Sequence, residues 1–220
     1  MSDVDRESER AIVAGLAAVR PDDAILAEEG TDREGTTGVR WVIDPLDGTA
    51  NYVTGYPAFG VSIGVEIDGE PAIGVVYDSA RSLLYEGVRG RGATRNGETI
   101  SVSERDDLAV ALIATGFGYD PELRAAQAAE IGRIASRVAD FRRSGSAAID
   151  LCTVACGEVD AYYEENLAPW DMAGGRVIAE EAGAKVVTLE TSRGGALTVA
   201  ANPRLIDPLV GLLLDADRGL

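Results

Sequence analysis

WVIDPLDGTANY, residues 41–52, begins as an apolar strand and ends as a polar turn. The turn opens with two carboxylates, Asp44 and Asp47, and Gly48 and Thr49 follow directly. Asp, Pro and Gly are common turn formers, so one interpretation is an ordinary surface turn. The other is a metal site, in which the carboxylates hold divalent cations beside backbone N–H groups that suit a phosphate. Other features of the chain decide between the two.

The length and composition are those of one globular unit. The chain has 220 residues, of which 46% are hydrophobic. We expect a single domain over 1–220, with an N-terminal lobe of about 1–140 that carries the metal site and a C-terminal lobe of about 141–220. No apolar run is long enough to cross a bilayer, and the charged N-terminus lacks a signal-peptide pattern. These features predict a cytoplasmic protein that does not associate with membranes.

The charge balance restricts the partners. The formal net charge at pH 7 is −17, from 37 acidic and 20 basic side chains. Such an excess of negative charge argues against binding to nucleic acid or to an anionic membrane. If the substrate is itself an anion, the site needs cations, and metal ions are the obvious source.

Residue types that are missing exclude several mechanisms. The chain contains no histidine, which excludes Ser-His-Asp and Cys-His catalysis and His-ligated zinc. It has no G-x-x-x-x-G-K-[ST] loop of P-loop NTPases and no G-x-G-x-x-G fingerprint of dinucleotide sites. Carboxylates, hydroxyls, arginines and backbone amides remain, and hard oxygen ligands select Mg²⁺ or Mn²⁺.

Cys152 and Cys156 lie one helical turn apart. They could contribute to a metal site, but no second cysteine pair or histidine completes it. We therefore expect two reduced core residues.

Hydrophobic periodicity predicts helices and antiparallel strands in separate blocks, which is typical of an α+β layered sandwich. A loop without apolar anchors, expected to be mobile, is predicted at residues 31–38. Helices are predicted at residues 5–20, 121–140, 169–183 and 202–216, with a further helix around the cysteines. Strands are predicted at 24–30, 40–45, 111–117, 159–165, 185–189 and 196–200, with an antiparallel meander over 59–100.

Four carboxylates stand at the ends of these elements, where functional side chains converge on a rigid scaffold. They are Glu28, Asp44, Asp47 and Asp171. Pro45 lies between the two aspartates of the turn and restricts its backbone, so both can face one metal cluster. Asp171 alone could equally be a helix N-cap. The combination of four such acids in a histidine-free chain favours the metal site.

Three separated segments resemble a known family. ILAEEG (25–30), WVIDPLDGTANY (41–52) and PWDMAGGRVIAEEAGAKV (169–186) resemble, in this order, the inositol monophosphatase family of Mg²⁺-dependent, lithium-sensitive phosphatases. FRRSGSAAIDLC and VDAYYE fit the same pattern, and the wording is closest to actinobacterial inositol-1-monophosphatases. The resemblance runs from about residue 2 to the C-terminus and implies a five-layered αβαβα sandwich.

The resemblance also implies roles for individual residues. Glu28, Asp44 and the Leu46 carbonyl would hold a first Mg²⁺, and Asp44, Asp47 and Asp171 a second, with a weaker third ion near Glu28. Thr49, paired with Asp5 and aided by Glu28, would orient the nucleophilic water. The amides of Gly48 and Thr49 would bind phosphate. The leaving polyol would contact Gly145, Ser146, Ala147 and Glu164, with Asp47 and Asp171 near the ester oxygen.

The expected activity is hydrolysis of inositol monophosphate. The alternatives are fructose 1,6-bisphosphate, histidinol phosphate or 3′-phosphoadenosine phosphate as substrate, or a weakly active binding or regulatory protein. A homodimer is possible, since the family is commonly dimeric. Family members carry one further helix before the segment that matches SDVD, residues 2–5, so we expect any contact from that helix to be missing here.

Overall fold

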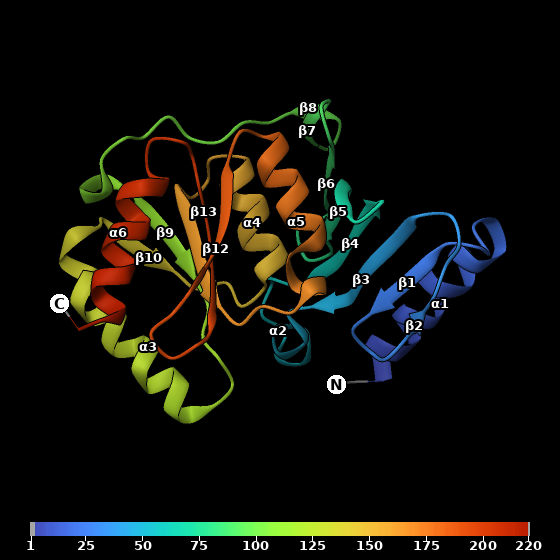
Figure 1. Cartoon of the computed structure of the whole chain (residues 1–220), viewed down its shortest axis with the longest axis horizontal. Coiled ribbons are helices and arrows are strands. Elements are labelled where there is room, and N and C mark those ends of the chain that lie inside the picture. The colour runs from blue at the N-terminus through green and yellow to red at the C-terminus, as the bar shows by residue number, and fades with distance from the viewer. Residues whose placement is uncertain (1–2, 220) are drawn as a thin grey trace.

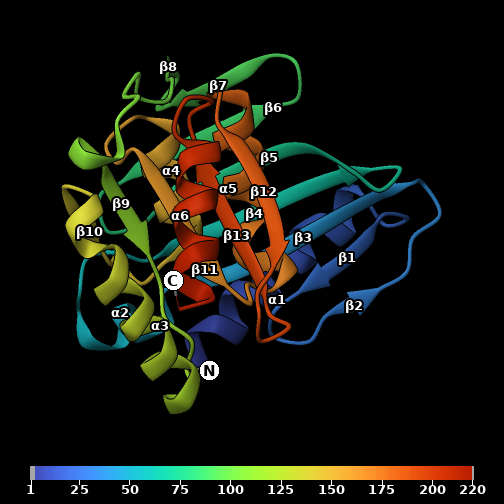
Figure 2. The same cartoon turned by 60° about the vertical axis from the view of Figure 1, so that its left-hand side comes forward.

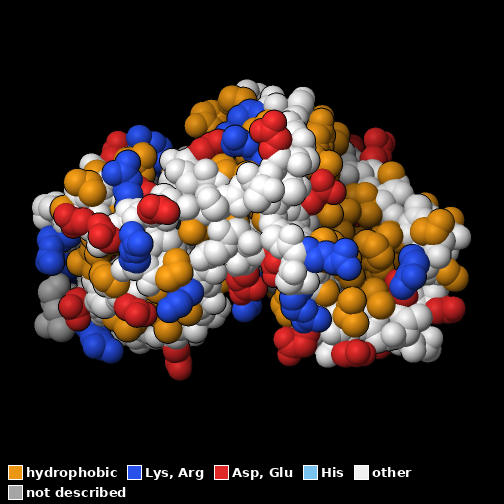
Figure 3. Space-filling model, turned by 90° about the horizontal axis from the view of Figure 1, so that it is seen from above, with side chains coloured by type: hydrophobic (Ala, Val, Ile, Leu, Met, Phe, Trp, Pro, Cys, Tyr) orange, Lys and Arg blue, Asp and Glu red, His pale blue; other side chains and the backbone are white. Residues whose placement is uncertain are grey.

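The computed structural model describes residues 3–219. These residues form five layers, in the order helix, sheet, helices, sheet, helices (Figure 1). The predicted α+β class and the αβαβα sandwich are therefore confirmed. Seen from above, a notch separates the two halves of the molecule, and acidic side chains lie within it (Figure 3).

The first layer is helix α1 (Asp3–Val19), which covers one end of the first sheet. Apolar side chains on its inner face pack against Ile25 and Ile43. The helix ends just before the predicted boundary, because Pro21 disfavours a helical conformation at Arg20.

The second layer is an eight-stranded sheet in the order β2-β1-β3-β4-β5-β6-β7-β8. Its strands are β1 (Ala24–Ala27), β2 (Asp32–Arg33), β3 (Val39–Asp47), β4 (Gly60–Ile67), β5 (Glu70–Asp78), β6 (Leu83–Val88), β7 (Gly92–Arg95) and β8 (Glu98–Thr99). All neighbours from β3 to β8 are antiparallel, which confirms the predicted meander. Strands β1 and β3 are parallel, so the sheet is mixed.

The central layer consists of helices α4 (Ala147–Ala155) and α5 (Pro169–Glu181). Helix α5 approaches the first sheet so closely that a side chain at Gly74 would overlap the carbonyl oxygen of Gly174. Small residues on both surfaces are therefore needed to bring the start of α5 next to the end of β3.

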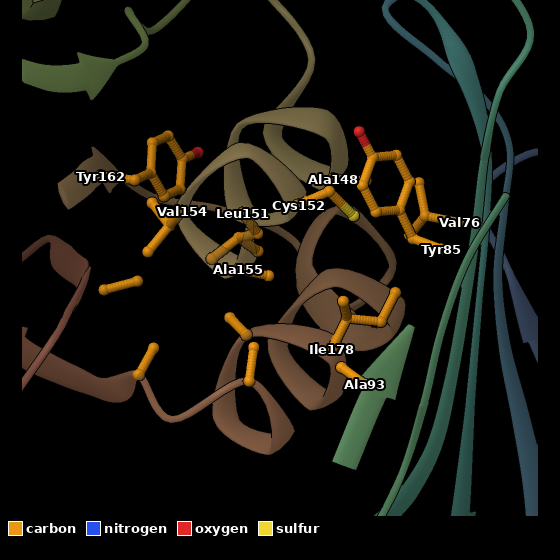
Figure 4. Packing of buried hydrophobic residues seen from close by; sticks show 14 of the residues in the cluster. Val76, Tyr85, Ala93, Ala148, Leu151, Cys152, Val154, Ala155, Tyr162 and Ile178 are labelled. Carbon is orange, nitrogen blue, oxygen red and sulfur yellow. The ribbon is translucent and has the colours of Figure 1, made fainter. Parts of the chain in front are cut away.

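The main hydrophobic core surrounds these two helices. Leu151 and Ile178 lie between Tyr85 of the first sheet and Tyr162 of the second (Figure 4). Cys152 belongs to the same cluster and Cys156 packs at its margin, both as free thiols. The prediction of reduced cysteines in the core is correct for Cys152, and Cys156 is only partly buried.

The fourth and fifth layers form the other half of the molecule. The second sheet has the order β10-β9-β11-β13-β12, and helices α3 and α6 cover its outer face (Figure 2). Its strands are β9 (Leu112–Thr115), β10 (Asp140–Arg142), β11 (Ala161–Glu165), β12 (Lys185–Glu190) and β13 (Ala196–Ala201), and the helices are α3 (Pro121–Ile134) and α6 (Ile206–Asp217). Short elements complete the chain: α2 (Thr49–Thr54), η1 (Leu108–Val110) and η2 (Ala135–Arg137).

Two local predictions are wrong. The helix predicted over residues 121–140 ends at Ile134, and β10 follows because its three residues pair in parallel with the edge strand β9. The segment 31–38, predicted as a loop without anchors, contains β2 and is held by polar contacts. The Thr31 hydroxyl donates to Glu9 (2.5 Å) and the Thr37 hydroxyl to Asp23 (2.6 Å). A search for apolar anchors misses both.

Within residues 3–219, none of the helices has the length and hydropathy needed to cross a bilayer.

Candidate functional site

A cavity of about 300 Å³ opens where the ends of both sheets meet the starts of α2 and α5. It is lined by Glu28, Asp44, Leu46, Asp47, Gly48, Thr49, Phe117, Tyr119, Arg143, Gly145, Ala147, Glu164, Leu167, Ala168, Trp170 and Asp171. All the predicted site residues except Asp5 and Ser146 are in this lining. Residues more than 100 positions apart in the sequence therefore face one space.

The two aspartates of the opening motif lie on a distorted strand end. Strand β3 continues through Asp47 instead of ending at Pro45, and its pairing with β4 shifts register between Asp44 and Asp47. The backbone N–H of Leu46 donates to Asp44 Oδ1 (3.0 Å). Because an irregularity of this kind re-aims side chains, both carboxylates can face the cavity.

Gly48 and Thr49 form the turn from β3 into α2. Gly48 has φ 83°, and a Cβ there would lie 2.7 Å from the carbonyl oxygen of Ala58. Only glycine fits this turn without strain. The Thr49 hydroxyl lies 3.1 Å from Asp5 Oδ1 and 3.1 Å from the Leu46 carbonyl oxygen, and it can donate to either. Asp5 is thus connected to the cavity through Thr49.

Asp171 has two positions to fill at once. It is the third residue of α5, and its Oδ2 accepts a hydrogen bond from the N–H of Ala168, the N-cap residue (2.7 Å). The carboxylate also lines the cavity. Helix capping and a role in the cavity are therefore compatible, because the cap uses only one of the two oxygens.

Burial raises the pKa of all four predicted metal-site acids. It is the largest cause for Glu28, for Asp44, whose pKa lies well above its usual value, for Asp171, and for Asp47, whose pKa rises to about 7. The charge of Asp171 adds to the rise at Glu28, Asp44 and Asp47. None of the four forms an ion pair with Arg or Lys within residues 3–219, although many other acids do. The site holds a buried negative charge with no protein cation to balance it.

This donor set fits a hard divalent cation. The available groups are carboxylates, the Leu46 carbonyl and the Thr49 hydroxyl, all oxygen ligands of the kind that Mg²⁺ and Mn²⁺ prefer. The described acids and cysteines do not form a ready-made group of three around one point, and the Leu46 carbonyl is within hydrogen-bond distance of Thr49. Binding a cation would therefore require the side chains to converge and would relieve the repulsion among them.

The other end of the cavity comes from the second half of the chain. Glu164 accepts a hydrogen bond from the Tyr162 hydroxyl at Oε2 (2.8 Å). Gly145 and Ala147 lie at the start of α4 and leave space beside Glu164. Ser146, predicted to contact a polyol, is buried and points elsewhere: its hydroxyl donates to Asp47 Oδ2 (2.6 Å). As it stands, Ser146 orients Asp47 and does not line the cavity.

Hydrogen bonds across about 100 residues of sequence join the two ends. Asp47 Oδ2 also accepts from the N–H of Ala148 (2.7 Å). The amide Nδ2 of Asn51 donates to the carbonyl oxygens of Ala58 (2.6 Å) and Ser144 (2.9 Å). The turn after β3 and the loop before α4 are therefore fixed relative to each other.

Sequence reasoning missed four residues of this region: Asn51, Phe117, Tyr119 and Arg143. Asn51 and Arg143 lie inside motifs that were already recognised, WVIDPLDGTANY and FRRSGSAAIDLC. A buried-type amide within a strand-turn-helix motif is a usable signal for Asn51. No local pattern marks Phe117 or Tyr119, which the fold brings to the cavity on the loop after β9.

Comparison with known proteins identifies the family. The model of the inositol monophosphatase family matches residues 1–212. The chain is 42% identical to the inositol-1-monophosphatase SuhB of Mycobacterium tuberculosis (strain H37Rv), over 96% of this chain and 76% of that protein. It is 40% identical to the Nus factor SuhB of Escherichia coli K12, over 98% of this chain and 82% of that protein.

Solved structures agree with the sequence comparison. The extragenic suppressor protein SuhB of Bartonella henselae superimposes with a TM-score of 0.90 at 35% identity, over 97% of this chain and 84% of that one. The inositol monophosphatase of Anabaena gives 0.87 at 39% identity, over 96% and 86%. The chain belongs to the inositol monophosphatase family and is a phosphatase of the phosphoric monoester hydrolase class.

Proposed function

We propose that this protein is a Mg²⁺-dependent phosphatase that hydrolyses inositol monophosphate to inositol and phosphate, with Mn²⁺ as a possible substitute. The observation that carries the proposal is the cavity in which Glu28, Asp44, Asp47 and Asp171 lie buried with raised pKa values and no basic partner. Divalent cations would balance this charge and at the same time attract an anionic substrate.

The proposed ligands follow the family resemblance. Glu28, Asp44 and the Leu46 carbonyl hold one cation, and Asp44, Asp47 and Asp171 hold a second. Cations in such a pair act as Lewis acids on the phosphate and make a water molecule more nucleophilic. The weaker ion near Glu28 is the third site in this scheme.

The residues of the chain itself have three tasks. Thr49 donates its hydroxyl proton to Asp5, which leaves the Thr49 oxygen free to accept a hydrogen bond from the attacking water. The first N–H groups of α2, at Gly48 and Thr49, have no carbonyl four residues earlier and are available to phosphate oxygens. Glu164, beside Gly145 and Ala147, accepts hydrogen bonds from the hydroxyls of the leaving polyol.

A binding role is the competing function. Relatives at 40% identity are named Nus factor SuhB, which favours an interaction role for at least part of the family. The set of acids in the cavity is the argument for catalysis, because a protein retained only for binding has no need for four buried carboxylates that repel one another.

Phosphate release from four substrates tests the proposal. Inositol 1-phosphate, fructose 1,6-bisphosphate, histidinol phosphate and 3′-phosphoadenosine phosphate are each assayed with Mg²⁺, with Mn²⁺, with Ca²⁺ and with excess chelator. We expect hydrolysis of inositol 1-phosphate with Mg²⁺ or Mn²⁺, inhibition by Ca²⁺, which tolerates looser geometry, and no turnover in chelator. Full activity in chelator would overturn the metal mechanism. Negligible release from every substrate would favour the binding role.

A further inference from the structure

One basic side chain stands out in the cavity. Five acids face this space: Glu28, Asp44, Asp47, Glu164 and Asp171. Of the described residues that line it, Arg143 is the only Lys or Arg. It lies in the loop before α4, at the end of the cavity formed by the second half of the chain.

The guanidinium of Arg143 is not used by the protein. Its neighbour Arg142 donates to Asp140 Oδ2 (2.6 Å) and to the carbonyl oxygen of Phe141 (2.8 Å). Arg143 makes no hydrogen bond or ion pair with any residue in the described range 3–219. Burial raises the pKa of Glu164, and the charge of Arg143 works against that rise from a distance. The five N–H donors of Arg143 thus face the cavity and solvent.

The backbone that carries Arg143 is nevertheless well anchored. Asn51 donates to the carbonyl oxygen of the next residue, Ser144 (2.9 Å), and the Ser144 hydroxyl accepts from the N–H of Ser146 (3.2 Å). Ser146 is in turn bonded to Asp47. A Cβ on Gly145 would overlap Nη1 of Arg143, so glycine leaves room for the guanidinium over the loop. A fixed base with an unpaired head group is suited to binding a ligand.

The position of Arg143 decides which part of the substrate it meets. The scissile phosphate is assigned to the opposite end, beside α2 and the predicted cation ligands. A neutral polyol next to Glu164 has no group that requires a full positive charge. A guanidinium presents a planar pair of N–H donors that matches a phosphate or carboxylate in bidentate geometry.

We propose that Arg143 is a specificity residue that binds a second anionic group, a phosphate or a carboxylate, on the leaving alcohol. The inference rests on the proposed phosphatase function and extends its substrate class from neutral polyol phosphates to phosphate esters that carry another negative charge. Arg143 would act on recognition of the leaving group and not on the attacking water.

The alternative is that Arg143 only offsets the negative charge of Glu164 and its surroundings. In that case its loss should change the handling of all substrates by a similar factor, because the perturbed groups are common to them. Recognition of a second anion predicts instead a change in the ratio between substrate classes.

The experiment compares kcat/KM for inositol 1-phosphate and glycerol 2-phosphate, whose leaving groups are neutral, with fructose 1,6-bisphosphate and 3-phosphoglycerate. The last two distinguish a second phosphate from a carboxylate. The variants are Arg143→Gln, which removes the charge, and Arg143→Lys, which keeps the charge but loses the paired donors. Arg142→Gln is the matched control, since Arg142 is adjacent, exposed and directed to Asp140.

We expect Arg143→Gln to lower the ratio of kcat/KM for the doubly charged substrate over that for inositol 1-phosphate by about 10- to 100-fold, as expected for losing a hydrogen-bonded charge partner. Arg143→Lys should recover part of the ratio, and Arg142→Gln should leave it unchanged. An unchanged ratio in Arg143→Gln, even with lower overall activity, overturns the inference.

The same measurements separate this inference from the proposed function. If the wild-type protein releases no phosphate from any of the four substrates with Mg²⁺, the phosphatase proposal fails first. If the wild type hydrolyses inositol 1-phosphate but neither doubly charged substrate, the phosphatase proposal stands and the role of Arg143 is refuted.

Discussion

The two ends of the cavity are built in different ways. At one end, carboxylates project from a strand end and a helix start, and Asp44 and Asp47 are only 2% and 9% exposed. At the other end, Arg143 and Tyr119 stand on loops, and Tyr119 is 90% exposed. The rigid, buried end suits chemistry that must be the same for every substrate. The exposed end can change from one relative to another without disturbing the core.

The largest expected effect tests whether the buried end performs the chemistry. Asp171→Asn keeps a residue that can accept the hydrogen bond from Ala168, so the melting temperature should stay near that of the wild type. Losing one electrostatic group of this kind typically lowers the rate by about 10²–10³. Turnover of inositol 1-phosphate should fall accordingly, with partial rescue at high Mg²⁺.

A matched control for this variant is Asp120→Asn. Asp120 caps α3 through bonds from the N–H groups of Glu122 and Leu123, away from the cavity. Both variants should melt alike, and only Asp171→Asn should lose turnover. Normal turnover in Asp171→Asn at ordinary Mg²⁺ would return Asp171 to a purely capping role and remove α5 from the chemical end.

A second test uses pH to separate the two ends. Burial raises the pKa of Asp47 from 3.8 to about 7. Its contribution to stability without a cation is therefore fully present below about pH 4 and is lost as pH rises towards 7, because the folded state resists ionisation there. Cation binding requires the ionised form, so Mg²⁺ affinity should increase with pH by up to about tenfold per unit below pH 7.

Calorimetric titration of Mg²⁺ between pH 5 and pH 8 measures this slope, with Asp47→Asn as the reference. In chelator, Asp47→Asn should melt progressively higher than the wild type as pH rises. The ratio of kcat/KM between singly and doubly charged substrates should depend on pH much less than Mg²⁺ affinity does. Mg²⁺ binding that is independent of pH would contradict the buried, uncompensated state of Asp47.

The smallest effect concerns the link between the ends. Asn51→Ala removes the hydrogen bonds to Ala58 and Ser144 and leaves two carbonyl oxygens without that donor, at about 1–3 kcal/mol each when buried. We expect a lower melting temperature and a KM for inositol 1-phosphate raised by several-fold, since the loop that carries Gly145 is no longer held to α2.

Thr54→Ala is the control for Asn51→Ala, because Thr54 lies in the same helix and its hydroxyl donates only to carbonyl oxygens of α2 itself, Ala50 and Asn51. It should affect KM little. If Asn51→Ala lowers stability but leaves KM unchanged, the two ends are positioned independently and the comparison between them becomes sharper.

Much of the buried end could be predicted from the sequence. Asp44, Asp47, Gly48 and Thr49 lie within a few residues of each other in WVIDPLDGTANY, so their proximity is covalent. The helices were visible because an apolar face repeats every three to four residues, which is a local property. The family resemblance supplied Glu28, Asp171 and the five layers, which no single local pattern contains.

The remaining features depend on contacts between distant segments. Ser146 turns its hydroxyl onto Asp47, 99 residues away, and Asn51 reaches Ser144 across 93. Strand β10 exists because β9 offers it an edge. Sequence by itself determined which acids and turns the chain carries. Only the tertiary structure decided which side chains face the cavity, because hydrogen bonding and burial are satisfied across the whole fold, and it left Arg143 unpaired there.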